Sequence, residues 1–177
     1  DRADILGTMR FQERKYVRKI IITTILKTDF ELHESFINVL ETKKIALKEC
    51  LSSTIGNRNT DKHLLINSIV HMANISHFAM PVVIATEWGK RIADEFDLVE
   101  TKKTTTTDDN YNGERVICKR HIQFIKETVK PSWQLFMQIL PFVGKLYINV
   151  DVSMDYYYNL LTEMKKESEE NNKISKK

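Results

Sequence analysis

Residues 62–76 read KHLLINSIVHMANIS, and the spacing of their apolar side chains decides the fold class. Leu65, Ile69 and Met72 fall on one face of a helix, because they are spaced by one helical turn. Three apolar neighbours widen that face: Ile66, Val70 and Ala73. A helix that is apolar over so much of its surface is usually buried, so the stretch predicts a buried helix.

The same helical spacing recurs along the rest of the chain. It predicts further helices over residues 12–27, from Asp29 to about residue 51, over 82–98 and 114–130, from Pro131 to Pro141, and up to Met164. In the segment 82–98 one face is formed by Ile84, Trp88, Ile92 and Phe96. Only 5 Gly and 3 Pro interrupt the chain, which favours long helices over a turn-rich fold. We therefore expect an all-α, compact multi-helix domain.

Three polar stretches separate or end these helices. Residues 56–60, GNRNT, predict a loop, and residues 100–113, with their run of four threonines, predict a mobile surface loop. The last apolar positions are Met154, Tyr157, Tyr158, Leu161 and Met164. Beyond them the chain is charged and polar. We expect one helical domain over residues 1–165 and a frayed polar tail over residues 166–177.

The composition excludes several classes of protein. With 27 basic and 24 acidic residues the net charge is +3, and no basic stripe alternates with aromatic residues. The sequence therefore predicts no nucleic-acid binding. No run of 18 apolar residues occurs, so we expect no membrane insertion.

Cysteine usage and the first residues indicate where the protein works. Cys50 and Cys118 lie far apart and form no CxxC pair, which favours a reducing compartment. The chain starts at Asp1 with no signal-peptide pattern and no initiator Met. We expect an intracellular protein, cytoplasmic or cytoskeleton-associated and not secreted, and we expect this chain to be a segment of a longer one.

Spacing alone identifies no catalytic or metal site. The five histidines form no HExxH motif, and His71 and His77 would point about 120° apart on one helix. The scattered glycines form no phosphate-binding loop, and no GxSxG elbow is present. From the residues alone, the sequence supports only a helical globular domain.

Three segments, in order, resemble the catalytic domain of class I cyclic nucleotide phosphodiesterases. Residues 20–33, IIITTILKTDFELH, are similar to that family's "ILATD…H" helix. Residues 64–96, from LLINSIVHMANISHFAMP to WGKRIADEF, resemble its "MHxADISNPxxPW…W…RIxxEF" stretch. Residues 121–133, HIQFIKETVKPSW, resemble its "QxGFIxxxVxPLW" segment. The resemblance implies the HD-domain-like helical fold of those enzymes, of which this chain is the C-terminal part with the N-terminal helices missing.

The resemblance also implies a metal position that has changed. Members of the family use zinc and magnesium to activate a water that attacks the cyclic phosphate. Three of the protein ligands come from motifs upstream of any segment in this chain. The fourth is the Asp of "ADISNP", and that position holds Asn74 here. An amide oxygen is neutral and a weaker ligand for a hard cation than a carboxylate. We therefore expect no cofactor in this chain, with zinc and magnesium needed only if a complete domain is active.

The position that holds the purine base has changed as well. The glutamine that pairs with the base in the family is His121 here, whereas Phe124 keeps the aromatic clamp position. By the same resemblance, Phe30 and His77 are further candidates for the nucleotide pocket. A neutral histidine makes one hydrogen bond to a base, not the paired set of a glutamine. The alternative is that His121 and Phe124 simply line the core.

These changes lead to three hypotheses. The first is a catalytically degenerate phosphodiesterase-like domain that acts as a structural or interaction module. The second is an active cyclic nucleotide phosphodiesterase whose metal-binding half lies outside this chain. The third is a domain that binds a cyclic nucleotide without hydrolysing it. Expected partners are other proteins or the missing N-terminal half of the same domain. Under the third hypothesis a cyclic nucleotide is a further partner.

Overall fold

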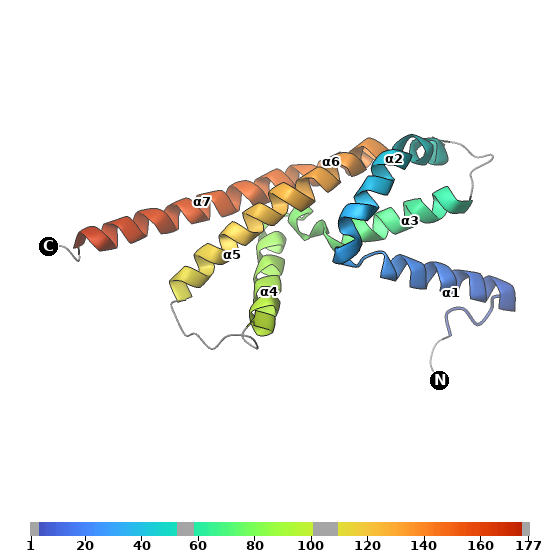
Figure 1. Ribbon diagram of the computed structural model, residues 1–177, viewed down its shortest axis with the longest axis horizontal. Helices are drawn as coiled ribbons and strands as arrows, with labels where there is room; N and C mark the ends of the chain where they lie inside the picture. Colours follow the sequence, from blue (N-terminus) through green and yellow to red (C-terminus); the bar gives the residue numbers. More distant parts are fainter. Residues whose placement is uncertain (1–3, 53–58, 101–109, 175–177) are drawn as a thin grey trace. The chain divides into compact units, whose positions relative to one another are not determined.

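Helices form all the regular structure that the computed structural model describes, which covers residues 4–52, 59–100 and 110–174 (Figure 1). The described residues contain no strand. The all-α prediction is therefore confirmed. The chain divides into two compact units, Asp1–Asn74 and Ile75–Lys177, and each is described by itself.

Unit 1, Asp1–Asn74, is built around its third helix. Its elements are α1 (Phe11–Leu26), the 3₁₀ turn η1 (Phe30–Leu32), α2 (His33–Ser52) and α3 (Asn59–Asn74). Helix α3 packs against both α1 and α2. The turn η1 begins at Asp29, whose carboxylate accepts a hydrogen bond from the backbone N–H of Glu31 at 3.1 Å. This side-chain cap starts the helical segment that continues into α2.

The interior of unit 1 contains polar as well as apolar side chains, which corrects the predicted buried face of α3. Met72 is buried as expected, but Ile69 is exposed. The buried polar side chains of the unit are Thr24, Asn67, Ser68 and His71. Thr24 Oγ1 donates a hydrogen bond of 2.7 Å to Asn67 Oδ1. Because buried polar groups need such partners, these contacts turn the polar side of α3 inward.

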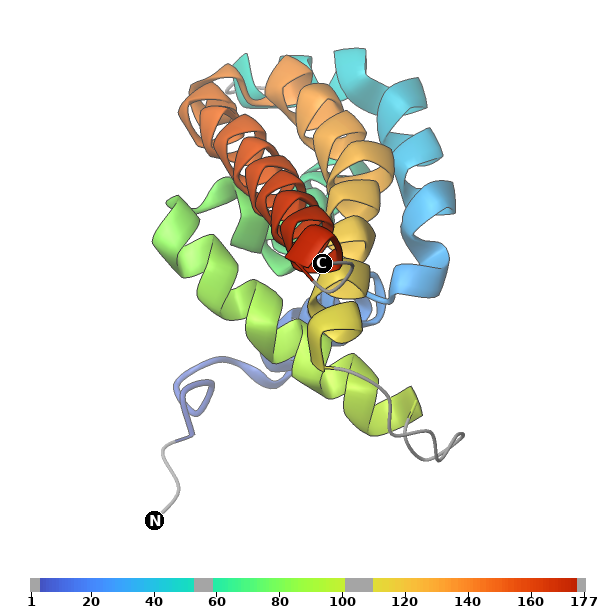
Figure 2. The same cartoon turned by 90° about the vertical axis from the view of Figure 1, so that its left-hand side faces the viewer.

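Unit 2, Ile75–Lys177, is built around two long helical rods that lie side by side. Its elements are η2 (Ser76–Ala79), α4 (Val82–Glu100), α5 (Asn110–Phe124), η3 (Ile125–Val129), α6 (Lys130–Ile139), η4 (Pro141–Val143) and α7 (Gly144–Ile174). Segments α5, η3 and α6 form one rod that lies beside α7, as both views show (Figures 1 and 2). Helix α4 also contacts α7. The turn η2 packs against α4 and α7.

The predicted helix at Pro131 is α6, which begins one residue earlier, at Lys130, with Pro131 in its first turn, and the backbone stays helical from α5 through η3 into α6. The segment η3 is a π-helical turn that precedes Pro131. A proline ring in an α-helix collides with the carbonyl four residues earlier and offers no N–H to it. The wider π turn accommodates the ring. The Ser132 hydroxyl donates a 2.6 Å hydrogen bond to the Thr128 carbonyl, which stabilises the same turn.

Helix α4 does not bury the large residues of the apolar face that its spacing outlines. Ile84 and Trp88 are about half exposed. The helix instead buries its small residues Ala85 and Ala93, with Gly89 midway between them. Small residues let a helix approach its neighbours closely, and this close approach takes precedence over the burial of larger side chains. The side chain of Phe96 lies outside the described residues.

Several element ends differ from the sequence-based prediction. Helix α4 extends to Glu100 and α5 begins at Asn110, so only residues 101–109 of the predicted loop remain, and they lie outside the described residues. Helix α3 begins at Asn59, inside the predicted loop at 56–60. Helix α7 continues to Ile174, so the predicted polar tail is helical over most of its length. The domain boundary at residue 165 stays a prediction. No described helix is long and apolar enough to cross a lipid bilayer.

Candidate functional site

Two histidines form a hydrogen-bonded pair in unit 1. His33 Nδ1 lies 2.8 Å from His71 Nε2, and His71 Nδ1 lies 2.8 Å from the Lys27 carbonyl oxygen. A carbonyl only accepts, so His71 donates through Nδ1. Its Nε2 then accepts from His33 Nδ1–H when both rings are neutral.

The surroundings of this pair keep both rings neutral. Burial lowers the pKa of His33, and the nearby His71 lowers it further. Burial also lowers the pKa of His71, partly opposed by the hydrogen bond to the Lys27 backbone. Phe30 stacks on His33 with ring centroids 5.3 Å apart. The proposed pocket residue Phe30 therefore lies in unit 1, against this pair.

Asn74 ends α3 one turn after His71, and its side chain is exposed. Its Nδ2 donates a hydrogen bond of 3.4 Å to the Thr28 carbonyl oxygen. Because that partner is an acceptor, the amide presents its N–H group there. A carboxylate at this position would place one of its oxygens beside the Thr28 carbonyl oxygen, and both atoms are acceptors. The side chain that replaces the family's metal-binding Asp thus has a structural contact that an Asp cannot make.

Three of the four proposed pocket residues, His77, His121 and Phe124, lie in unit 2 around the buried Phe78. The Phe78 ring is 4.1 Å from that of His77, 5.5 Å from that of His121 and 6.1 Å from that of Phe124, between centroids. The rings of His77 and Phe124 are nearly parallel, 11° apart in plane and 6.3 Å apart in position. The arrangement is an aromatic cluster with Phe78 at its centre.

His121 is buried in this cluster and contacts the core. Its ring lies 4.8 Å from that of Tyr157 between centroids. Burial lowers the pKa of His121, and a hydrogen bond between the ring and the Gly89 backbone opposes this shift only in part. One ring nitrogen is therefore already used within the protein. This position agrees with the alternative that His121 lines the core.

Sequence reasoning missed the polar residues of α7 that hold this cluster. Ser153 Oγ donates a 3.1 Å hydrogen bond to the Phe78 carbonyl, and Asn149 Nδ2 donates a 3.0 Å bond to the Ala79 carbonyl. Tyr157 follows on the same face and is buried, which raises its pKa to about 12. The i, i+4, i+8 spacing of these three residues was the available signal.

The described residues contain no group of three or more His, Cys, Asp or Glu side chains placed to hold a metal ion. The zinc and magnesium that the resemblance implies would need an oxygen ligand at residue 74. Asn74 can offer only its neutral amide oxygen, which is a weaker ligand for a divalent cation than a carboxylate. Residue 74 of this chain therefore lacks the negative charge of the family's metal ligand at that position.

The pKa of His77 makes the stability of the protein sensitive to acid. Burial, and to a smaller extent His121, lowers the pKa of His77 to about 4. Among the described residues its buried Nε2 has no hydrogen-bond partner. As the pH falls, the unfolded chain, with a histidine pKa of about 6.5, takes up the proton first. Stability is therefore full above pH ~6.5 and decreases toward pH ~4, with about 2 kcal/mol lost at pH ~5 through His77 alone.

Urea unfolding of the wild type and of His77→Gln, at pH about 7.5 and about 5, measures this effect. The variant should lose about 2 kcal/mol less than the wild type between the two pH values, since glutamine does not titrate. Equal losses in the two proteins would show that His77 binds its proton as readily in the folded state as in the unfolded state.

Comparison with known families assigns the chain. The family model described as 3'5'-cyclic nucleotide phosphodiesterase matches residues 1–150. This match covers most of the 177 residues. The chain therefore belongs to the 3'5'-cyclic nucleotide phosphodiesterase family.

Curated relatives share this assignment over a limited part of their length. A 3',5'-cyclic-AMP phosphodiesterase of Drosophila melanogaster, isoform F, is 25% identical over an alignment of 169 residues that covers 89% of this chain and 25% of that protein. The probable 3',5'-cyclic-AMP phosphodiesterase pde-4 of Caenorhabditis elegans is 24% identical over an alignment of 166 residues that covers 90% of this chain and 25% of that protein. The chain thus spans about a quarter of the length of these relatives.

Solved structures show the same fold. The phosphodiesterase domain of the RhoPDE fusion protein from the choanoflagellate Salpingoeca rosetta matches with a TM-score of 0.76 and 21% identity, over 92% of this chain and 52% of that one. The structure of LmjPDEB1 in complex with IBMX matches with a TM-score of 0.71 and 15% identity, over 91% of this chain and 48% of that one. The chain has the fold of about half of such a domain.

Proposed function

We propose that this chain is a catalytically degenerate phosphodiesterase-like domain that acts as a structural and interaction module. The observation that carries the proposal is Asn74. A neutral amide stands where the family places a metal-binding carboxylate, and its N–H group is engaged with the Thr28 carbonyl. The position therefore lacks the negative charge that helps to hold a divalent cation and to acidify its bound water.

His121 supports the same proposal from the nucleotide side. At the position where the family pairs a glutamine with the base, the imidazole is buried against Tyr157 and hydrogen-bonded to the Gly89 backbone. Such a ring cannot offer a base the donor and acceptor of an amide side by side. We propose that His121 packs the core and that the chain does not bind cyclic nucleotides with the specificity of an active enzyme.

A hydrolysis assay on the protein at its full natural length tests this proposal against the alternative of an active enzyme. Cyclic AMP or cyclic GMP is supplied with Mg²⁺ and Zn²⁺, and release of the nucleoside monophosphate is measured. We expect none above background. The 3',5'-cyclic-AMP phosphodiesterase of Drosophila melanogaster serves as the positive control. Hydrolysis by the wild type would overturn the proposal, and its loss in Asn74→Ala would make Asn74 a working ligand.

Replacing Asn74 by Asp tests the structural contact separately. The carboxylate would face the Thr28 carbonyl without a proton to donate. We expect a loss of stability of about 0.5–1 kcal/mol, because the side chain is exposed and the bond is long. Asn74→Ser, which keeps a donor, should lose less in the same urea titration. A stabilised Asn74→Asp would contradict the assigned donor role.

The remaining expectations follow from this proposal. We propose no resident cofactor for this chain. We also propose an intracellular site of action, cytoplasmic or cytoskeleton-associated. The partners are proteins or the other half of a phosphodiesterase-type domain. The chain covers 52% of the Salpingoeca rosetta domain, so a matching half of comparable size is the natural candidate.

A further inference from the structure

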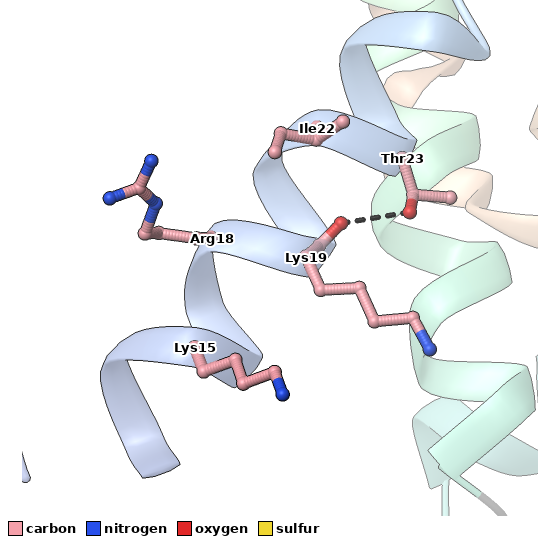
Figure 3. Close-up of a pocket in the computed structure, with 5 residues that line it drawn as sticks. All are labelled: Lys15, Arg18, Lys19, Ile22 and Thr23. Atoms are coloured by element: carbon pink, nitrogen blue, oxygen red, sulfur yellow. Dashed lines mark hydrogen bonds between the residues drawn. The ribbon is translucent and has the colours of Figure 1, made fainter. Parts of the chain in front are cut away.

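The outward surface of α1 combines a basic half with an apolar half. Lys15, Arg18, Lys19 and Ile22 follow one another at i, i+3, i+4 and i+7, which places them on one face of the helix. Together with Thr23 they line a shallow hollow of about 370 Å³. Figure 3 shows Lys15 and Lys19 extending from consecutive turns of α1 to one side, and Arg18 extending to the other side.

The basic half has no acidic partner within the described part of the chain. None of Lys15, Arg18 and Lys19 makes an ion pair or other polar contact there through its side chain. The Thr23 hydroxyl bonds the Lys19 carbonyl oxygen at 2.8 Å, so it belongs to the helix itself. Three cations on one face therefore present an uncompensated positive charge.

The apolar half follows directly along the same face. Ile22, Ile25 and Leu26 are exposed by 54%, 61% and 65%. Single exposed aliphatic residues are common, but three at i, i+3 and i+4 form a continuous strip. Unit 1 at the same time buries polar side chains, including Thr24 on the opposite face of α1. Exposed aliphatic side chains on one face and a buried polar side chain on the other are expected of a helix that packs on both sides.

We propose that this face of α1, defined by Lys15, Arg18, Lys19, Ile22, Ile25 and Leu26, binds an amphipathic helix of a partner that carries acidic residues along one half and aliphatic residues along the other. The acidic half neutralises the three cations, and the aliphatic half covers the isoleucines and leucine. This inference rests on the proposed role as an interaction module and names the chemistry of its partner.

Two synthetic helical peptides test the proposal on the 177-residue chain. Both carry a leucine stripe along one half, and they differ in the other half, which has three glutamates in one peptide and three lysines in its twin. Fluorescence anisotropy at about 0.15 M salt measures binding. We expect the glutamate peptide to bind at least ~10-fold more tightly than the lysine peptide, and less tightly at higher salt.

A charge-reversed protein provides the decisive comparison. The triple variant Lys15→Glu, Arg18→Glu, Lys19→Glu should no longer bind the glutamate peptide and should instead bind the lysine peptide. The matched control reverses three exposed lysines of α7, at positions 145, 165 and 166, with the same change in net charge, and should bind as the wild type does. Circular dichroism confirms that both variants keep their helices.

Three results would overturn the inference: no binding of either peptide at millimolar concentration, equal binding of both, or equal effects of the two charge reversals. Self-association of the chain that Ile25→Asp abolishes would also overturn it, because a second copy would then cover the face. None of these outcomes depends on metal binding or hydrolysis. A failure here therefore leaves the assignment of a degenerate site to be judged by its own assay.

Discussion

Replacing Gly89 by alanine is expected to destabilise the protein by about 2–3 kcal/mol, as for a residue forced into a well-packed core. A Cβ atom added there would lie 2.4 Å from Tyr157 Oη and 3.2 Å from His121 Nε2. The 2.4 Å distance is too short for unbonded atoms, so α4 or the Tyr157 ring must move. Either shift disturbs the buried contacts between α4, α5 and α7. Urea unfolding followed by circular dichroism measures the loss.

A second glycine of the chain provides a matched control. Gly113 also lies in a helix, α5, but a Cβ there meets no atom within 4 Å. Gly113→Ala is therefore expected to stabilise the protein by about 0.5 kcal/mol through helix propensity alone. In the Gly89→Ala background, Tyr157→Phe removes the clashing oxygen and should recover part of the loss. Similar effects of the two alanine substitutions would contradict the close approach at Gly89.

Phe78→Ala is expected to cost about 3–5 kcal/mol, the largest loss of any single side chain considered, because it empties the centre of a buried aromatic cluster. Phe78 is fully buried, and its ring lies within 6.1 Å of the rings of His77, His121 and Phe124 between centroids. The substitution leaves a cavity that the surrounding helices fill only partly. Thermal and urea unfolding should both report the loss.

Phe142→Ala is the control for the loss of a phenylalanine side chain as such. Phe142 is 75% exposed, so its removal should change the free energy of unfolding by less than about 0.5 kcal/mol. A cost at Phe142 similar to that at Phe78 would contradict the central position assigned to Phe78. The motif that residues 64–96 resemble has proline at the position of Phe78.

The helical fold could be predicted from the sequence because it depends on the regular spacing of apolar residues. Apolar residues at i, i+3 and i+4 are enough to identify a helix, and the segments around α1, α3 and α7 all have this spacing. The buried face was harder to predict, because a large apolar residue is not always the one that packs. On α4 the small Ala85 and Ala93 are buried while Trp88 is about half exposed, which no count of apolar residues reveals.

The candidate site could be predicted only in part. The resemblance identified Asn74 and His121 as altered positions, since it compares residue types one by one. It could not show that Asn74 donates to the Thr28 carbonyl, or that His121 packs on Tyr157, because both contacts join segments distant in sequence. Contacts of this kind depend on tertiary packing, which local patterns do not encode.

Metal content is the measurement that tests the central claim most directly. The protein at its full natural length is purified without chelators, dialysed, and analysed for zinc by mass spectrometry, beside the Drosophila melanogaster 3',5'-cyclic-AMP phosphodiesterase. Because Asn74 supplies a neutral amide where the family has a carboxylate, we expect well below one tightly bound zinc per domain. One zinc per domain that survives dialysis, and is lost in Asn74→Ala, would contradict the account.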